Sequence, residues 1–242
     1  MLPISWQPVP TGDLVLVGPP GDGGYVVLGA SARDATLLLS MGLNDDWRFE
    51  EQFRKLTGAR VLCFDGTVSE RFWQKRTIFA LMRLRISRAL DYWRYHRFFR
   101  GDEVQHRKVM IGYDVPGSVS LETLLSQIDD ATIFLKIDIE GSEYRILDQI
   151  AAHQDRFSGV VLELHDIDLQ RDRVARWIEA MSEFAVIALH VNNSGGVDPA
   201  GDPCVIEVSL AKRGYLRDRG GEADIVRTAN DPGLPDVEPV FG

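Results

Sequence analysis

The chain has 242 residues, 45% of them hydrophobic and 26% charged, and its formal net charge is −9. This length and composition suit one globular α/β domain with a full core, and the acidic charge argues against general nucleic-acid binding. No apolar run is long enough to cross a bilayer.

The cysteines and the first residues bear on location. Cys63 and Cys204 lie in apolar, strand-like runs, which favours free thiols over a disulfide framework. The opening MLPISWQPVPTGD has no basic start and no continuous apolar region, so it does not resemble a signal peptide. We therefore expect a cytoplasmic protein.

Short apolar runs alternate with helical patterns along the chain, which predicts an α/β fold with a mostly parallel sheet and helices on both faces. We expect seven strands, at Thr36–Ser40, Arg60–Phe64, Lys108–Ile111, Ile133–Asp138, Gly159–Leu164, Ala185–His190 and Pro203–Leu210. We expect helices at Trp47–Leu56, Leu121–Gln127, Ser142–His153 and Gln170–Ser182, with one or two more within Glu70–Phe99. The loop before the last strand has no room for a crossover helix, so that strand should be antiparallel.

A helical insert is expected at Thr67–Arg107, after the second strand. It carries ten Lys and Arg residues against four Asp and Glu residues, interleaved with aromatic side chains. The simpler interpretation is a lid that packs on the core with solvated bases. The alternative is a contact surface for an anionic substrate, a partner protein or a membrane face, and its contact residues would be Arg83, Arg85, Arg88, Tyr92 and Trp93. We expect a single domain over residues 1–213 and an irregular extension over residues 214–242.

Three glycine-containing segments lie where a ligand could bind. Gly18–Val27 (GPPGDGGYVV) predicts a hairpin with Asp22 near its tip, which could also serve as a flap over a ligand. Gly42 follows the first strand and would let the backbone approach a nucleotide-like ligand, although a plain turn explains one glycine equally well. Asp65 ends the second strand, about twenty residues later, where a carboxylate often binds a ribose diol; a solvated Asp-Gly turn is the alternative.

Acidic residues and a histidine follow the next two strands. Asp138 and Glu140 come directly after a buried, β-branched run, and His165 follows the strand after that. Ligands of open α/β sheets bind at this edge, and histidine is the commonest general base near neutral pH. The same region could hold Mg²⁺ or Mn²⁺, but the spacing is not strict and we favour a metal-free site. The ligands of such an ion would come from Asp138, Glu140, Glu163, His165 and Asp166.

The string LKIDIEGSEYRIL, from Leu135 to Leu147, resembles the signature of the FkbM-type methyltransferase family. GDGGYVV, LSMGLNDDWRFEEQF, VLELHDID, HVNNSGG and VIEVSLAKR also fit that family, although each is weak alone. The resemblance implies a Rossmann-like class I methyltransferase fold, S-adenosylmethionine as cofactor, and O-methylation of a sugar, glycan or other polyhydroxylated metabolite.

The positions of individual residues at the strand ends, taken with the resemblance, suggest their roles. The cofactor would contact Asp22, Gly24, Tyr25, Gly42, Asp65, Gly66 and Asp138. The catalytic groups would be His165, Asp138 and Glu140. A family member that has lost its chemistry and acts as a binding or scaffold protein is the alternative. An NAD-dependent oxidoreductase has less support, because the chain lacks both the three-glycine fingerprint and a Tyr-x-x-x-Lys motif.

Overall fold

The computed structural model describes residues 1–112, 116–129, 131–217, 225 and 227–242. Residues 218–224 and 226 of the expected C-terminal extension lie outside the described residues. No helix of the described residues is both long enough and apolar enough to cross a membrane.

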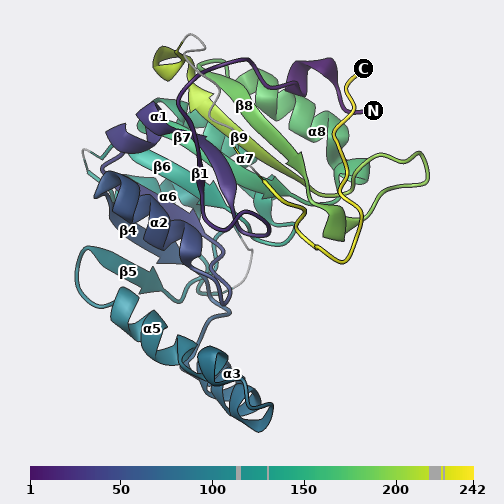
Figure 1. Cartoon of the computed structure of the whole chain (residues 1–242). Helices are drawn as coiled ribbons and strands as arrows, with labels where there is room; N and C mark the ends of the chain where they lie inside the picture. The colour runs from purple at the N-terminus through teal and green to yellow at the C-terminus, as the bar shows by residue number, and fades with distance from the viewer. Residues whose placement is uncertain (113–115, 130, 218–224, 226) are drawn as a thin grey trace.

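A seven-stranded sheet forms the centre of the molecule (Figure 1). Its strands are β3 (Leu37–Met41), β4 (Arg60–Phe64), β5 (Val104–Arg107), β6 (Ile133–Ile137), β7 (Phe157–Leu164), β8 (Phe184–Val191) and β9 (Ile206–Lys212). Their order is β5-β4-β3-β6-β7-β9-β8, and only β9 runs antiparallel to its two neighbours. The predicted Rossmann-like methyltransferase arrangement, with its antiparallel last strand, is confirmed.

The strand predicted at Lys108–Ile111 is wrong, because the edge strand β5 lies earlier, at Val104–Arg107. An edge strand has only one hydrogen-bonded neighbour and need not be an apolar run; of these four residues only Val104 is buried. The apolar run after β5 is a loop that reaches the core, where Ile111 is buried and bridges to Val119.

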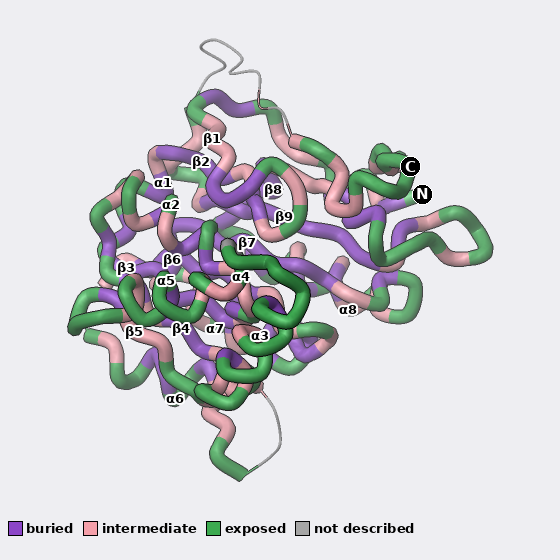
Figure 2. The backbone as a smooth tube through the Cα atoms, turned by 60° about the horizontal axis from the view of Figure 1, so that its bottom comes forward, coloured by how far each residue is buried: buried purple, intermediate pink, exposed green. Residues whose placement is uncertain are grey.

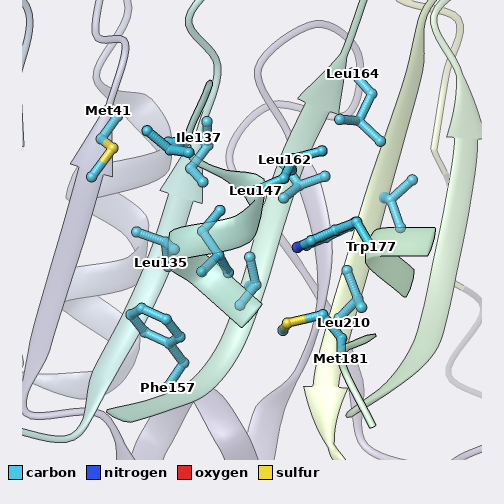
Figure 3. Packing of buried hydrophobic residues seen from close by; sticks show 14 of the residues in the cluster. Met41, Leu135, Ile137, Leu147, Phe157, Leu162, Leu164, Trp177, Met181 and Leu210 are labelled. Carbon is cyan, nitrogen blue, oxygen red and sulfur yellow. The ribbon is translucent and has the colours of Figure 1, made fainter. Parts of the chain in front are cut away.

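Helices cover both faces of the sheet. They are α1 (Gly29–Asp34), α2 (Arg48–Thr57), α3 (Glu70–Met82), α4 (Ile86–Ala89), α5 (Asp91–Phe98), α6 (Leu121–Ser126), α7 (Leu147–Ala152) and α8 (Ile167–Ala180). On one face, Figure 3 shows Leu147 of α7, Trp177 of α8 and Met181, which follows α8, packed near Leu162 and Leu210 of the sheet. The other face packs against α1, α2 and an N-terminal hairpin.

The helix predicted at Ser142–His153 is broken in the structure. Its first turn is a 3-10 turn, η2 (Glu143–Arg145), and α7 begins only at Leu147. The Glu143 side chain accepts hydrogen bonds from the backbone amides of Ile139 and Gly141, both at 3.2 Å. These bonds hold a tight turn after β6, and a regular helix cannot start there.

The predicted N-terminal hairpin is confirmed, with β1 (Leu14–Val17) antiparallel to β2 (Tyr25–Leu28). Its loop folds back tightly: a Cβ on Gly24 would lie 1.8 Å from the carbonyl oxygen of Pro19, so only glycine fits.

The predicted insert is an arm formed by α3, α4 and α5, which projects from the body (Figure 1). Trp73 and Tyr95 are buried at its base, where the Trp73 ring meets Trp47 with centroids 5.9 Å apart. Figure 2 shows α3 and α4 mostly exposed, and Met82 and Leu84 at the far end are 77% and 87% exposed.

Candidate functional site

The turns that follow β3, β4, β6 and β7 line a pocket of about 610 Å³. The direction of strand order reverses between β3 and β6, and ligands of open α/β sheets bind at such a point. Of the predicted site residues, the pocket is lined by Asp22, Gly42, Asp65, Asp138, Glu140 and His165. Gly24, Tyr25 and Gly66 lie outside this lining.

Gly42 brings two turns of the pocket into contact. Its φ is +84°, and a Cβ there would lie 1.5 Å from the carbonyl oxygen of Asp138, so any other residue would force the turns apart. The buried Lys136 donates to the carbonyl of Gly42 at 2.8 Å and lies 3.5 Å from Glu50. Burial opposes its charge, but Glu50 and Asp138 keep the pKa of Lys136 above its ordinary value.

Asp65 fastens the same turn from β4. One carboxylate oxygen accepts from the amides of Leu43 and Asn44, at 3.0 and 2.9 Å, and the other accepts from the amide and hydroxyl of Thr67. Burial alone would raise the pKa of Asp65, but these hydrogen bonds outweigh it and lower the pKa. Asp65 thus lines the pocket and holds the turn that forms its wall. A ribose hydroxyl would have to donate to carboxylate oxygens that already accept four hydrogen bonds from the protein.

Asp138, Glu163 and His165 form one cluster at the ends of β6 and β7. One carboxylate oxygen of each acid and one ring nitrogen of His165 all lie within 4.8 Å of one another. Burial raises the pKa of Asp138. Burial and the charges of Asp138 and Glu207 raise the pKa of Glu163 to about 8, although Asn192 donates to its carboxylate at 2.6 Å. The prediction that Asp138 and His165 lie at one sheet edge is confirmed by this placement.

His165 is held by Glu143, a residue to which the sequence assigned no role. Its Nδ1 lies 3.0 Å from Oε1 of the fully buried Glu143. Burial would lower the pKa of His165, but the bond to Glu143 and the nearby carboxylates raise it to about 9. His165 is therefore protonated at neutral pH in the free chain.

Glu140 lies at the rim of the pocket. Its side chain is 80% exposed, and one carboxylate oxygen is 3.6 Å from Nε2 of His165. Its φ of 53° is left-handed, as are the φ angles of Asn44 (48°) and Asp166 (51°) in the turns after β3 and β7. Such conformations cost free energy in residues other than glycine and concentrate at functional sites.

The other three predicted residues, Tyr25, Gly66 and Gly24, support the surroundings of the pocket and do not line it. The Tyr25 ring is buried behind the pocket, and Gly66 packs on Met110, where a Cβ would lie 2.6 Å from Sδ. Gly24 serves the hairpin loop. Cofactor contacts for these three residues stay predictions.

The sequence missed the polar residues that support the cluster from behind. Glu207 of β9 is buried beside Glu163 and pairs with Arg227 and Asn230 of the C-terminal segment. The signal for Glu207 was a carboxylate inside an apolar strand, since a buried charge needs a partner. Its partners could not be found, because they lie about twenty residues further along the chain.

Residues 87–189 match the family model described as the methyltransferase FkbM domain. The predicted resemblance to the FkbM family is confirmed. The match covers less than half of the chain, from α4 to β8, and contains the whole Asp138, Glu163 and His165 cluster. The comparison with curated proteins gives no match.

Among solved structures, the chain is similar to an rRNA methylase from Streptococcus thermophilus, at 12% identity, with 76% of this chain and 92% of that chain covered and a TM-score of 0.42. It is also similar to the 23S rRNA methyltransferase ErmE, at 9% identity, 79% and 69% coverage and a TM-score of 0.43. A third is the precorrin-6y C5,15-methyltransferase from Geobacter metallireducens, at 11% identity, 76% and 84% coverage and a TM-score of 0.36. Likenesses this distant carry no argument about the methyl acceptor.

Proposed function

We propose that this protein is an S-adenosylmethionine-dependent O-methyltransferase that acts on a hydroxyl group of a sugar, a glycan or another polyhydroxylated metabolite. The observation that carries the proposal is the cluster of Asp138, Glu163 and His165, which converges on the pocket within the family-matched stretch. The acceptor class is what the family resemblance implies.

The pocket fits a cofactor of this kind. Its volume of about 610 Å³ is in the range of small-molecule sites. Its wall combines apolar side chains with many polar ones, most of them acidic. The residues proposed to hold the cofactor are Asp22, Gly42, Asp65 and Asp138. When bound, the cofactor supplies a methyl group activated on a sulfonium.

The chain would supply position and a proton acceptor. A hydroxyl has a high pKa, so its oxygen attacks readily only when a nearby group takes the proton. We assign that role to His165, oriented by Glu143 and placed beside Asp138. Because the pKa of His165 is about 9, it must first lose its own proton, and the rate should rise as the pH approaches that value.

One observation favours a non-catalytic family member instead. The Asp65 carboxylate already accepts four hydrogen bonds from Leu43, Asn44 and Thr67, which suits a structural anchor better than a ribose ligand. A binding or scaffold protein could keep this anchor without transferring a methyl group.

Calorimetry with S-adenosylmethionine, S-adenosylhomocysteine and NAD separates these functions. The proposal expects both sulfur compounds to bind and NAD not to bind. Transfer of a labelled methyl group to a panel of sugars and glycans, with RNA as the comparison, then tests the acceptor class. Absence of binding by either sulfur compound to the folded protein would refute the proposal.

A further inference from the structure

We propose that Asp138, Glu163 and His165 bind one divalent cation of the Mn²⁺ type, which positions the acceptor hydroxyl. The acceptor's part in this inference rests on the proposed function, whereas the cation site itself rests on the geometry of the cluster. The sequence left five residues of this region as candidate ligands and favoured a metal-free site, and the family match assigns no metal; the structure selects three of the five.

The three side chains converge from neighbouring strands of a rigid sheet. Asp138 follows β6, Glu163 lies in β7 and His165 follows β7, and their ligand atoms lie within 4.8 Å of one another. Two carboxylate oxygens and one imidazole nitrogen form a donor set that suits Mn²⁺. Three protein ligands would leave coordination positions for oxygens of a sugar. A cation at Nε2 of His165 would displace the proton there and would itself lower the pKa of a bound hydroxyl. His165 would therefore be a ligand in the metal-bound state and the proton acceptor only in the metal-free state.

The surrounding residues hold the ligands as in known metal sites. A histidine that binds a metal through one ring nitrogen usually donates its other N–H to a carboxylate. The Glu143 carboxylate pairs with Nδ1 of His165 at 3.0 Å. This contact leaves Nε2 as the nitrogen available to the cluster. Asn192 holds Oε1 of Glu163 at 2.6 Å and leaves the second oxygen of that carboxylate for a ligand.

A buried hydroxyl gives a second, independent indication. Tyr25 is 1% exposed, and its hydroxyl has no hydrogen-bond partner among the described residues. Tyr25 lies on β2, which contacts β7 and β9, the strands that carry Glu163 and Glu207, and the charges of Asp138, Glu207 and Glu163 act on its hydroxyl. A buried polar group of this kind ordinarily has a partner, and an oxygen bound to the cation would provide one.

The lysine and arginine nearest the cluster are bonded to other carboxylates. Lys136 is bonded to Gly42 and paired with Glu50, and Arg227 is paired with Glu207. Buried carboxylates are normally paired or bound to a metal. Glu140 is 80% exposed and its carboxylate lies 3.6 Å from Nε2 of His165, beyond hydrogen-bond distance, so it does not occupy that nitrogen.

The test uses Mn²⁺ alone with the full chain, by calorimetry and by electron paramagnetic resonance of the unbound ion. Wild type should bind one Mn²⁺ per chain. Asp138→Asn and Glu163→Gln should each weaken binding at least 10-fold. Glu143→Gln, which keeps an oxygen for the turn after β6 but removes the charge that orients His165, should weaken it about 10-fold. The matched control is Asp168→Asn, which removes an exposed carboxylate nearby on α8 and should leave the affinity within about two-fold of wild type.

Wild-type protein that shows no saturable Mn²⁺ binding overturns the proposal. Equal affinity in wild type and in a folded Asp138→Asn or Glu163→Gln variant overturns it as well. Thermal melting checks each variant, and if Glu163→Gln fails to fold, Asp138→Asn decides. Binding of S-adenosylhomocysteine, measured separately, distinguishes the two proposals. If S-adenosylhomocysteine binds and Mn²⁺ does not, only the cation site is refuted. If Mn²⁺ binds and S-adenosylhomocysteine does not, only the methyltransferase proposal is refuted.

Discussion

The strand-end pocket and the helical arm arrange their charges in opposite ways. In the pocket, Asp138, Glu163 and His165 are withdrawn from water and act on one another, so their pKa values move far from the ordinary ones. On the arm, the arginines stay near water and pair locally: Arg76 and Arg88 with Asp45 of the body, and Arg94 with Asp91.

The pocket residues are arranged for chemistry, whereas the charged pairs of the arm fix its position on the body. Converging buried groups can store or move a proton, whereas exposed pairs contribute little energy and mainly fix where a segment lies. A groove of about 1290 Å³ separates the arm from the body, and it shares Asp22, Asp45 and Asp46 with the pocket. The arm is therefore placed to influence what enters the pocket without touching the cluster.

The largest effect should come from the cluster itself. His165→Ala should lower kcat by roughly 10²–10⁴ and leave the affinity for S-adenosylhomocysteine nearly intact. In EDTA the wild-type rate should rise with pH toward about 9, as His165 loses its proton, and the variant should lose that dependence. His153→Ala, at the end of α7, is the control. A fully active His165→Ala enzyme would remove His165 from the mechanism.

A second test concerns stability. The pKa of Glu163 is about 8 when folded, against an ordinary value near 4.5, so the folded chain keeps a proton that the unfolded chain releases. The contribution of Glu163 to stability should be fully present below pH 4.5 and be lost as the pH rises to 8, by up to about 1.4 kcal/mol per pH unit.

Glu163→Gln should remove this loss, so in EDTA the variant should be the more stable protein above pH 8. The measurement is the free energy of unfolding in urea at several pH values for both chains. Parallel pH curves for the two proteins would contradict the assignment of this proton to Glu163.

A third test asks whether Asp65 belongs to the site or only to its wall. Asp65→Ala should weaken S-adenosylhomocysteine binding by about 1–3 kcal/mol, and it should also lower the melting temperature, because the amides of Leu43 and Asn44 lose their acceptor. A lower melting temperature with unchanged affinity in the folded variant would leave Asp65 a purely structural anchor.

Sequence patterns predicted the fold and the site correctly where the residues of a single strand or loop determine the local structure. The apolar run of β6 and its terminal Asp138 placed the site at the sheet edge, and the missing crossover helix predicted the antiparallel β9. The patterns failed where a role depends on distant partners. β5 is an edge strand without an apolar run, Glu143 turns back to His165 rather than out to solvent, and Asp65 is occupied by the turn after β3.

The smallest effect should come from the arm. Reversing Arg83, Arg85 and Arg88 to Glu should raise the acceptor KM several-fold and leave cofactor affinity unchanged, because exposed charges act on the approach of a ligand more than on the chemistry. Arg176→Glu on α8, exposed but far along the chain from the arm, is the control. Steady-state kinetics at low and high salt should show the difference shrink as salt rises, since exposed charges are screened. If the triple reversal prevents folding, the arm is a structural part of the domain. If the folded variant keeps its KM, the charges of the arm contribute nothing to substrate entry, and only the buried groups of the pocket affect the reaction.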